Sequence, residues 1–150
     1  MALRENSLEI RTFSGPGYAP LVDFGQWRVA LLRYIDELLP ERLDQMQRHD
    51  QTDEVFVLLT GRCILFLGEG QEDAGMIHAV DMEPQKIYNV KRGCWHTHTL
   101  NRDASVLVVE NRDTAAVNSP TLKLDEPQRS LLVDLTGRLW NKPSPSSGKP

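Results

Sequence analysis

Short runs of strand-forming residues alternate with tight turns along the chain, and this pattern limits its fold more than any other feature. Clusters of Gly, Pro, Asn, Asp and Ser mark the turns, for example at residues 14–17 and 118–120. Runs rich in Val, Ile, Leu, Phe, Thr and Tyr lie between the turns, at residues 8–13, 27–35, 54–60, 63–67, 76–80, 87–91, 96–100, 105–110 and 121–124. Many short strands joined by tight turns pack as antiparallel sheets. We therefore predict an all-β fold, an antiparallel double-sheet β-barrel or sandwich.

A single helix is expected near the C-terminus. Its apolar residues recur at helical spacing and share one face after a candidate N-cap at Asp125; they are Leu131, Leu132, Leu135 and Leu139. We expect this helix to pack on the sheet, and residues 1–140 to form one domain. Residues 141–150 contain Pro, Ser and Gly but no apolar side chain, which predicts a disordered tail. Residues 40–46 carry a weaker pattern for one further helical turn.

The strand predicted at 54–60 is apolar on both of its faces. Phe56 and Leu58 point to one side, and Val55 and Val57 point to the other. The run at 105–110 has the same two-sided pattern. Such an outer wall needs cover, which the C-terminal helix is expected to supply in part. We predict that a homodimer formed sheet to sheet covers the rest.

Charge, hydropathy and cysteine content exclude several classes of protein. The 150 residues include 17 Lys and Arg and 21 Asp and Glu, a net charge of −4, which argues against a nucleic-acid partner. The longest apolar run, residues 55–59, is far shorter than the ~20 residues that cross a bilayer. Two cysteines, Cys63 and Cys94, make no disulfide framework and match no zinc pattern. We therefore expect a soluble, cytoplasmic protein with no membrane partner.

Three of the four histidines lie in two short segments. Residues 47–54 read QRHDQTDE, and residues 91–98 read KRGCWHTH. These segments resemble the two motifs of the cupin superfamily of RmlC-like small β-barrels, G(X)5HXH(X)3-4E(X)6G and G(X)5PXG(X)2H(X)3N. Matching positions are His49, Glu54 and Gly61 in the first motif and Gly93 and His96 in the second. The resemblance spans residues 27–110 and implies a cupin, or jelly-roll, barrel.

The match to the cupin motifs is incomplete at three positions. Gln47 stands where the family usually has its first histidine, so the first motif is degenerate. Lys91 stands where the second motif has proline, and Asn101 lies one position later than that motif asks.

The resemblance implies that His49, Glu54 and His96 bind one divalent transition metal, which could be Fe, Mn, Ni or Zn. Two imidazoles and one carboxylate form a facial triad with open positions for water, oxygen or substrate. Because side chains alternate along a strand, His98 should face inward with His96. His98 then either replaces the missing histidine or hydrogen-bonds a ligand, and the amide oxygen of Gln47 is another candidate donor. Trp95 either closes the pocket mouth or fills one end of the barrel.

Three functions are compatible with this reading. The first is a metal-dependent dioxygenase, isomerase or lyase that acts on a small polar metabolite held in the barrel. The second is a non-catalytic module that binds a small molecule. The third is a metal-free enzyme resembling sugar-nucleotide epimerases. Its candidate base is His49 or His96, and its candidate acid is Tyr34 or Tyr88. The candidate phosphate-binding cations are Arg33, Arg48 and Lys91.

Overall fold

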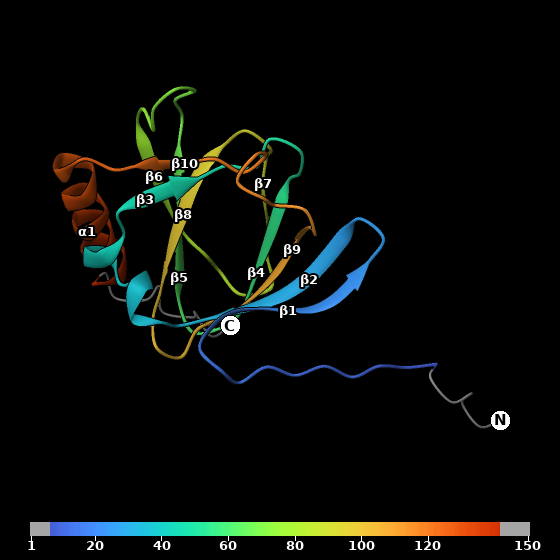
Figure 1. Ribbon diagram of the computed structural model, residues 1–150. Helices are drawn as coiled ribbons and strands as arrows, with labels where there is room; N and C mark the ends of the chain where they lie inside the picture. The colour runs from blue at the N-terminus through green and yellow to red at the C-terminus, as the bar shows by residue number, and fades with distance from the viewer. Residues whose placement is uncertain (1–6, 142–150) are drawn as a thin grey trace, which may run out of the picture.

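Residues 7–141 form two antiparallel five-stranded sheets and one C-terminal helix, as predicted (Figure 1). The computed structural model describes residues 7–141. One sheet has the strand order β1-β2-β9-β4-β7, and the other has the order β10-β3-β8-β5-β6. The strands are β1 (Gly17–Phe24), β2 (Trp27–Arg33), β3 (Gln45–Gln47), β4 (Glu54–Thr60), β5 (Cys63–Gly68), β6 (Ile77–Asp81), β7 (Ile87–Val90), β8 (Trp95–Leu100), β9 (Ser105–Asn111) and β10 (Thr121–Lys123). Two short 3-10 helices, η1 (Asp36–Leu38) and η2 (Pro40–Arg42), join β2 to β3, and helix α1 spans Glu126–Trp140.

The main core lies between the two sheets. Phe56 and Leu58 of β4 and Val106 of β9 face across the interior toward Leu65 of β5 and Leu100 of β8, and each of these side chains is at most 1% exposed. Alternation along the strands decides which side chains take part, because every second residue of a strand points to the same face. The same alternation turns Glu54, His96 and Glu110 toward the interior, so the polar site is built into the wall of this core.

Helix α1 packs on the outer face of the sheet that contains β5 and β6. Asp125 caps it through a capping box with Gln128, as its place before the apolar stripe predicts. Leu132 is fully buried against a second apolar cluster that includes Ile64 and Phe66 of β5. The helix therefore covers only one of the two outer walls. Among residues 7–141, no helix is long and apolar enough to cross a membrane.

The outer wall of the other sheet is apolar and has no helical cover from α1. Two cross-strand rows run over β2, β9 and β4, namely Val29–Val109–Val55 and Leu31–Leu107–Val57. All six side chains are half-buried. The expectation that α1 would cover part of this wall is wrong at β4 and β9, because the apolar face of the helix packs on the other sheet.

Several predicted boundaries need correction. Residues 8–13 form no strand, and Leu8 and Ile10 are 68% and 80% exposed, because a strand pattern gives a strand only where a neighbour completes the hydrogen-bond ladder. Strand β1 escaped prediction because Pro20 interrupts it; the proline lies at an irregularity of an edge strand, where a missing N–H is tolerated. Residues 40–46 form η2 and the start of β3. The tail predicted at 141–150 lies outside the described residues, apart from Asn141.

Candidate metal centre

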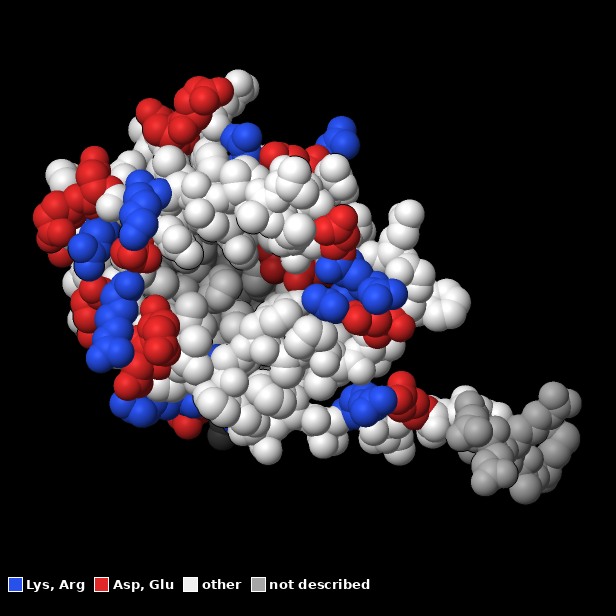
Figure 2. All heavy atoms as spheres, viewed as in Figure 1, with Lys and Arg blue, Asp and Glu red and all other residues white. Residues whose placement is uncertain are grey.

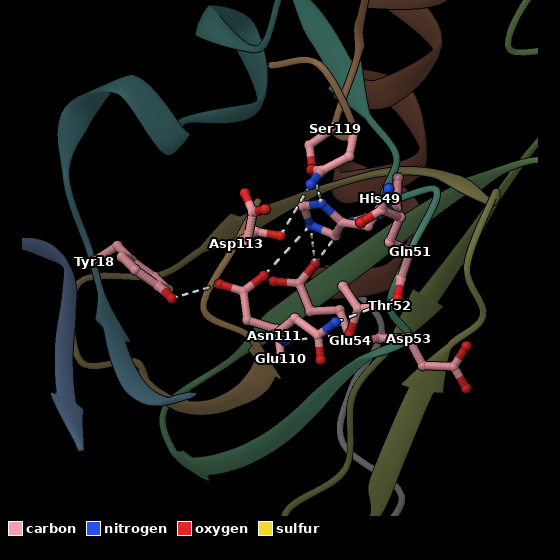
Figure 3. Close-up of polar contacts among 12 residues, drawn as sticks. Tyr18, His49, Gln51, Thr52, Asp53, Glu54, Glu110, Asn111, Asp113 and Ser119 are labelled. Atoms are coloured by element: carbon pink, nitrogen blue, oxygen red, sulfur yellow. Dashed lines mark hydrogen bonds and ion pairs between the residues drawn. The ribbon is translucent and has the colours of Figure 1, made fainter. Parts of the chain in front are cut away.

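Three buried side chains from separate segments converge in the interior. Figure 3 shows two of them, His49 and Glu54, pointing toward one another. His49 follows β3, Glu54 begins β4, and His96 lies on β8 beside the end of β3. Their donor atoms all lie within 4.8 Å of one another. Glu54 Oε2 is 3.1 Å from His49 Nε2 and 2.7 Å from His96 Nε2. The structure therefore brings together the three residues that the motif resemblance pointed to.

Hydrogen bonds on the far side of each imidazole determine which ring nitrogen carries a proton. His96 Nδ1 donates to the carbonyl oxygen of Cys94 over 2.9 Å, because a carbonyl can only accept. His49 Nδ1 lies 2.7 Å from Ser119 Oγ, and that hydroxyl donates its own proton to Asn118 Oδ1. The Ser119 oxygen therefore accepts from His49. Both histidines therefore carry a proton on Nδ1 and turn Nε2 toward Glu54, so Nε2 is the atom that would bind a metal ion once it has no proton.

The donor set fits a divalent transition metal. Two Nε2 lone pairs facing a carboxylate oxygen repel unless a proton or a metal ion lies between them. Metal bonds of about 2.0–2.2 Å place neighbouring ligand atoms roughly 3 Å apart. The distances from Glu54 Oε2 to the two Nε2 atoms, 3.1 and 2.7 Å, are close to this spacing. Buried His49, Glu54 and His96 can thus hold a metal ion.

Charge interactions hold Glu54 in its ionised form. Burial by itself raises the pKa of this carboxyl, but hydrogen bonds from His49 and His96 outweigh burial and lower its pKa to about 2. Burial likewise lowers the pKa of His49, but its hydrogen bond to Glu54 and the charges of Glu54 and Glu110 raise that pKa above its ordinary value.

A second buried carboxylate, Glu110, lies beside the cluster. Its Oε2 atom is 3.5 Å from His49 Nε2, and its Oε1 atom accepts a 2.5 Å hydrogen bond from the Tyr18 hydroxyl (Figure 3). Burial and the nearby charge of Glu54 raise the pKa of Glu110, and burial and the bond to Glu110 raise the pKa of Tyr18. Neither Glu110 nor Tyr18 was predicted as a site residue from the sequence. Alternation along β9 could have identified Glu110. Every second side chain of a strand points to the same face, so Glu110 points inward with Val106 and Val108.

A cavity of about 520 Å³ adjoins the cluster. His49, Glu54 and Glu110 line its polar end, and the apolar side chains at its wall are Leu32, Ile35, Leu38, Phe56 and Val108. No Lys or Arg is among the lining residues. Figure 2 shows a hollow in this face of the molecule, with acidic atoms visible at its edge. The cavity volume falls within the range of small-molecule sites.

Three further residues were predicted to be ligands or to line the pocket. Gln47 and His98 line the cavity. The Nδ1 atom of His98 is buried without a hydrogen-bond partner among the described residues, and burial lowers the pKa of this histidine to about 4. Trp95 is 4% exposed and packs in the cluster beneath α1, where its indole N–H donates to the carbonyl oxygen of Gln71. Trp95 is not among the residues that line the cavity.

Candidate phosphate-binding cations and tyrosine acids lie elsewhere. Arg48 stacks on Trp95 and pairs with Asp50, and exposed Lys91 pairs with half-buried Asp53. Arg33 alternates with inward-facing Leu32 on β2, so it points to the opposite face. The hydroxyl of Tyr34 donates to Asp36, and that of Tyr88 accepts from the backbone N–H of Glu83. None of these five residues lines the cavity.

Comparison with solved structures identifies the fold. Pac13 from Streptomyces, solved with uridine, has a TM-score of 0.53 at 9% identity, over 79% of this chain and 87% of its own. CapF, solved with the inhibitor 3-isopropenyl-tropolone, has a TM-score of 0.52 at 12% identity, over 75% of this chain and 34% of its own. A cupin-2 domain protein from Shewanella frigidimarina has a TM-score of 0.49 at 14% identity, over 67% of this chain and 85% of its own. No protein-family model matches the sequence, and neither does any curated protein. The likeness to Pac13 and CapF shows that the chain shares their fold, and this is the cupin fold that its motifs indicated.

Proposed function

We propose that this protein binds one divalent transition metal, Fe, Mn, Ni or Zn, through His49, Glu54 and His96, and that a small polar molecule reaches the metal from the adjoining cavity. The observation that carries the proposal is the convergence of three buried donors whose two imidazoles both present Nε2. Ser119 and the Cys94 carbonyl hold these imidazoles in the metal-binding tautomer before any ion arrives.

The residues around the donors exclude water and shape the cavity that would hold the ligand. Phe56 is fully buried and its ring lies edge-on to His96 at 6.2 Å, which excludes water from one side of the donors. The apolar wall of the cavity accepts the carbon skeleton of a ligand, and the polar end orients its oxygen atoms toward the donors. A bound metal would act as a Lewis acid toward such an oxygen. Dioxygenase, isomerase and lyase reactions can all use this arrangement.

The second candidate function is binding of a metabolite without turnover. Gln47, which replaces the family's first histidine and lines the cavity, favours it. A metal-free epimerase acting on sugar nucleotides is disfavoured, because a diphosphate in this cavity would meet two carboxylates and no Lys or Arg. The two remaining candidates share the metal site and differ only in whether the ligand is consumed.

Metal titration of the full chain tests the proposal. Protein stripped with a chelator is titrated with Mn(II), Fe(II), Ni(II) and Zn(II) while thermal unfolding is recorded. One ion at a concentration 100 times its Kd should stabilise the fold by about 2.7 kcal/mol. His49→Ala and His96→Ala should abolish this gain. His78→Ala is the matched control, because His78 pairs with exposed Glu69 away from the cavity and should respond like wild type.

Two outcomes would contradict metal binding at this site. Either none of the four ions stabilises the wild type, or the His49 and His78 variants respond equally. Incubating metal-loaded protein with a metabolite extract, followed by mass spectrometry, then separates turnover from binding: a consumed compound supports an enzyme, and a compound retained unchanged supports a binding module.

The uncovered outer wall of β2, β9 and β4 supports a homodimer formed through this face. Its two rows of Val and Leu side chains are only half-buried in one chain. Two such walls packed face to face would remove these side chains from water, which is the main favourable term in association. We also propose a cytoplasmic location, because both cysteines are free and a reducing compartment keeps thiols in this state.

A further inference from the structure

Glu110 occupies a position that is unfavourable without a cation. Val55 of β4 pairs with Val109 of β9. In this antiparallel register Glu54, which precedes Val55, lies opposite Glu110, which follows Val109, and both face inward. Both are buried, at 5% and 8% exposure. Like charges directly opposite in a sheet are destabilising, and burial removes the water that would screen them. No Lys or Arg lines the cavity, and His49 at 3.5 Å and the charge of Arg28 offset only part of the burial and repulsion that raise the pKa of Glu110.

Glu110 is also oriented toward the donors. The Tyr18 hydroxyl donates to Oε1 over 2.5 Å and so leaves Oε2 turned toward His49 Nε2, at 3.5 Å (Figure 3). Tyr18 comes from β1, on the other side of β2 from β9, so the first hairpin of the chain holds a carboxylate that belongs to a distant strand. A separation of 3.5 Å from His49 Nε2 is near the spacing that neighbouring ligands of one metal ion adopt, about 3 Å and somewhat more in a tetrahedral site. Glu110 is not in the group of donors that all lie within 4.8 Å of one another, so its carboxylate would have to turn toward the other donors as an ion binds.

We propose that Glu110 is a fourth protein ligand, which makes the centre a site of two histidines and two carboxylates. The inference rests on the proposed function, since it assigns a further ligand to the same metal. It accounts for the two facing carboxylates, whose charges together balance a divalent ion. Tyr18 is a positioning residue that acts through Glu110.

The ligand set has a consequence for metal preference. A carboxylate in place of an imidazole makes the site harder and richer in oxygen. Mn(II) and Fe(II) bind imidazole as well as carboxylate. These two ions should therefore bind more tightly to a site with two histidines and two carboxylates than to a site with three histidines. The Glu110→Gln variant should therefore lose more affinity for Mn(II) than for Zn(II).

Spectroscopic titration with Co(II) provides the test. The stripped full chain is titrated with Co(II), and both Kd and the visible absorption bands of the bound ion are recorded. Glu110→Gln should weaken binding at least about 10-fold and change the bands, and Tyr18→Phe should weaken it less. Glu69→Gln is the matched control, because Glu69 forms an exposed pair with a histidine at 2.7 Å outside the site and should leave both readouts unchanged.

Folding is checked separately, by melting each metal-free variant. Metal-free Glu110→Gln should be at least as stable as wild type, because the substitution relieves the facing charges, so weaker binding cannot be attributed to unfolding. Crystals soaked in Co(II) give the bond directly: an anomalous peak about 2.0–2.2 Å from Glu110 Oε2 supports the assignment.

Three results would overturn the inference, and they can be told apart. If wild type binds Co(II) and Glu110→Gln binds it with the same Kd and bands, Glu110 is not a ligand, although the centre of two histidines and Glu54 stands. A Co(II) peak more than 3.5 Å from Glu110 Oε2 has the same meaning. If wild type binds no Co(II), the proposed function fails and this inference fails with it.

Discussion

The ionised state of Glu54 should control how stability of the metal-free protein depends on pH. This carboxyl is 5% exposed, and its hydrogen bonds from His49 and His96 lower its pKa from 4.5 to about 2. A carboxyl whose pKa is lower in the folded state stabilises the fold above its unfolded pKa. That stability is lost as pH falls from about 5 toward 2.

Glu54→Gln keeps the shape of the side chain and removes its charge. The gap between the two pKa values corresponds to about 3 kcal/mol at neutral pH. The variant should therefore be less stable than wild type by about 3 kcal/mol at pH 7. Near pH 2.5 most of this difference should be gone, because Glu54 is then largely protonated in the unfolded wild-type chain and partly protonated in the folded one.

Urea unfolding of metal-stripped protein, followed by circular dichroism from pH 7 to pH 2.5, measures this difference directly. Groups whose pKa does not depend on Glu54 cancel when the free energies of unfolding are subtracted. Glu69→Gln serves as control, and because its histidine pair is exposed it should cost at most about 1 kcal/mol at any pH. The reasoning is refuted if the difference between wild type and Glu54→Gln is the same at pH 6 and pH 2.5.

Three further substitutions test other parts of the structure. Ser119→Ala removes the acceptor that fixes the His49 tautomer and should weaken metal binding about 10-fold in a Zn(II) titration; an unchanged Kd would show that the hydroxyl plays no such part. Gly61→Ala places a Cβ 2.5 Å from backbone atoms at φ +73 and should cost at least about 2 kcal/mol in urea unfolding, more than Gly25→Ala, where φ is +56 and nothing lies within 4 Å; equal costs would contradict the clash. Leu107→Glu should convert a wild-type dimer to a monomer in light scattering, and either a monomeric wild type or a dimeric variant argues against the proposed face.

Local chemistry made much of the fold and half of the site predictable. A run of strand-forming Val, Phe and Leu identified the strand at 54–60, and Asp125 with Gln128 identified the start of the helix, because strand propensity and capping depend on residues a few positions apart. Spacing within two segments pointed to His49, Glu54 and His96, since each segment positions its own donors. The same local rules failed at residues 8–13, where the strand pattern has no neighbouring strand to satisfy it.

Contacts between distant segments were decided only by the tertiary structure. Tyr18 and Glu110 are 92 residues apart, and no periodicity shows that the sheet order places β1 and β9 on either side of β2. The choice of wall for α1 likewise depended on which sheet offered the matching apolar surface. By itself, the sequence determined what each segment prefers, because strand alternation and caps are local. Which segments meet depends on closing long loops around a shared core, so the pairing of Glu54 with Glu110 and its consequence for the metal centre could be known only from the folded chain.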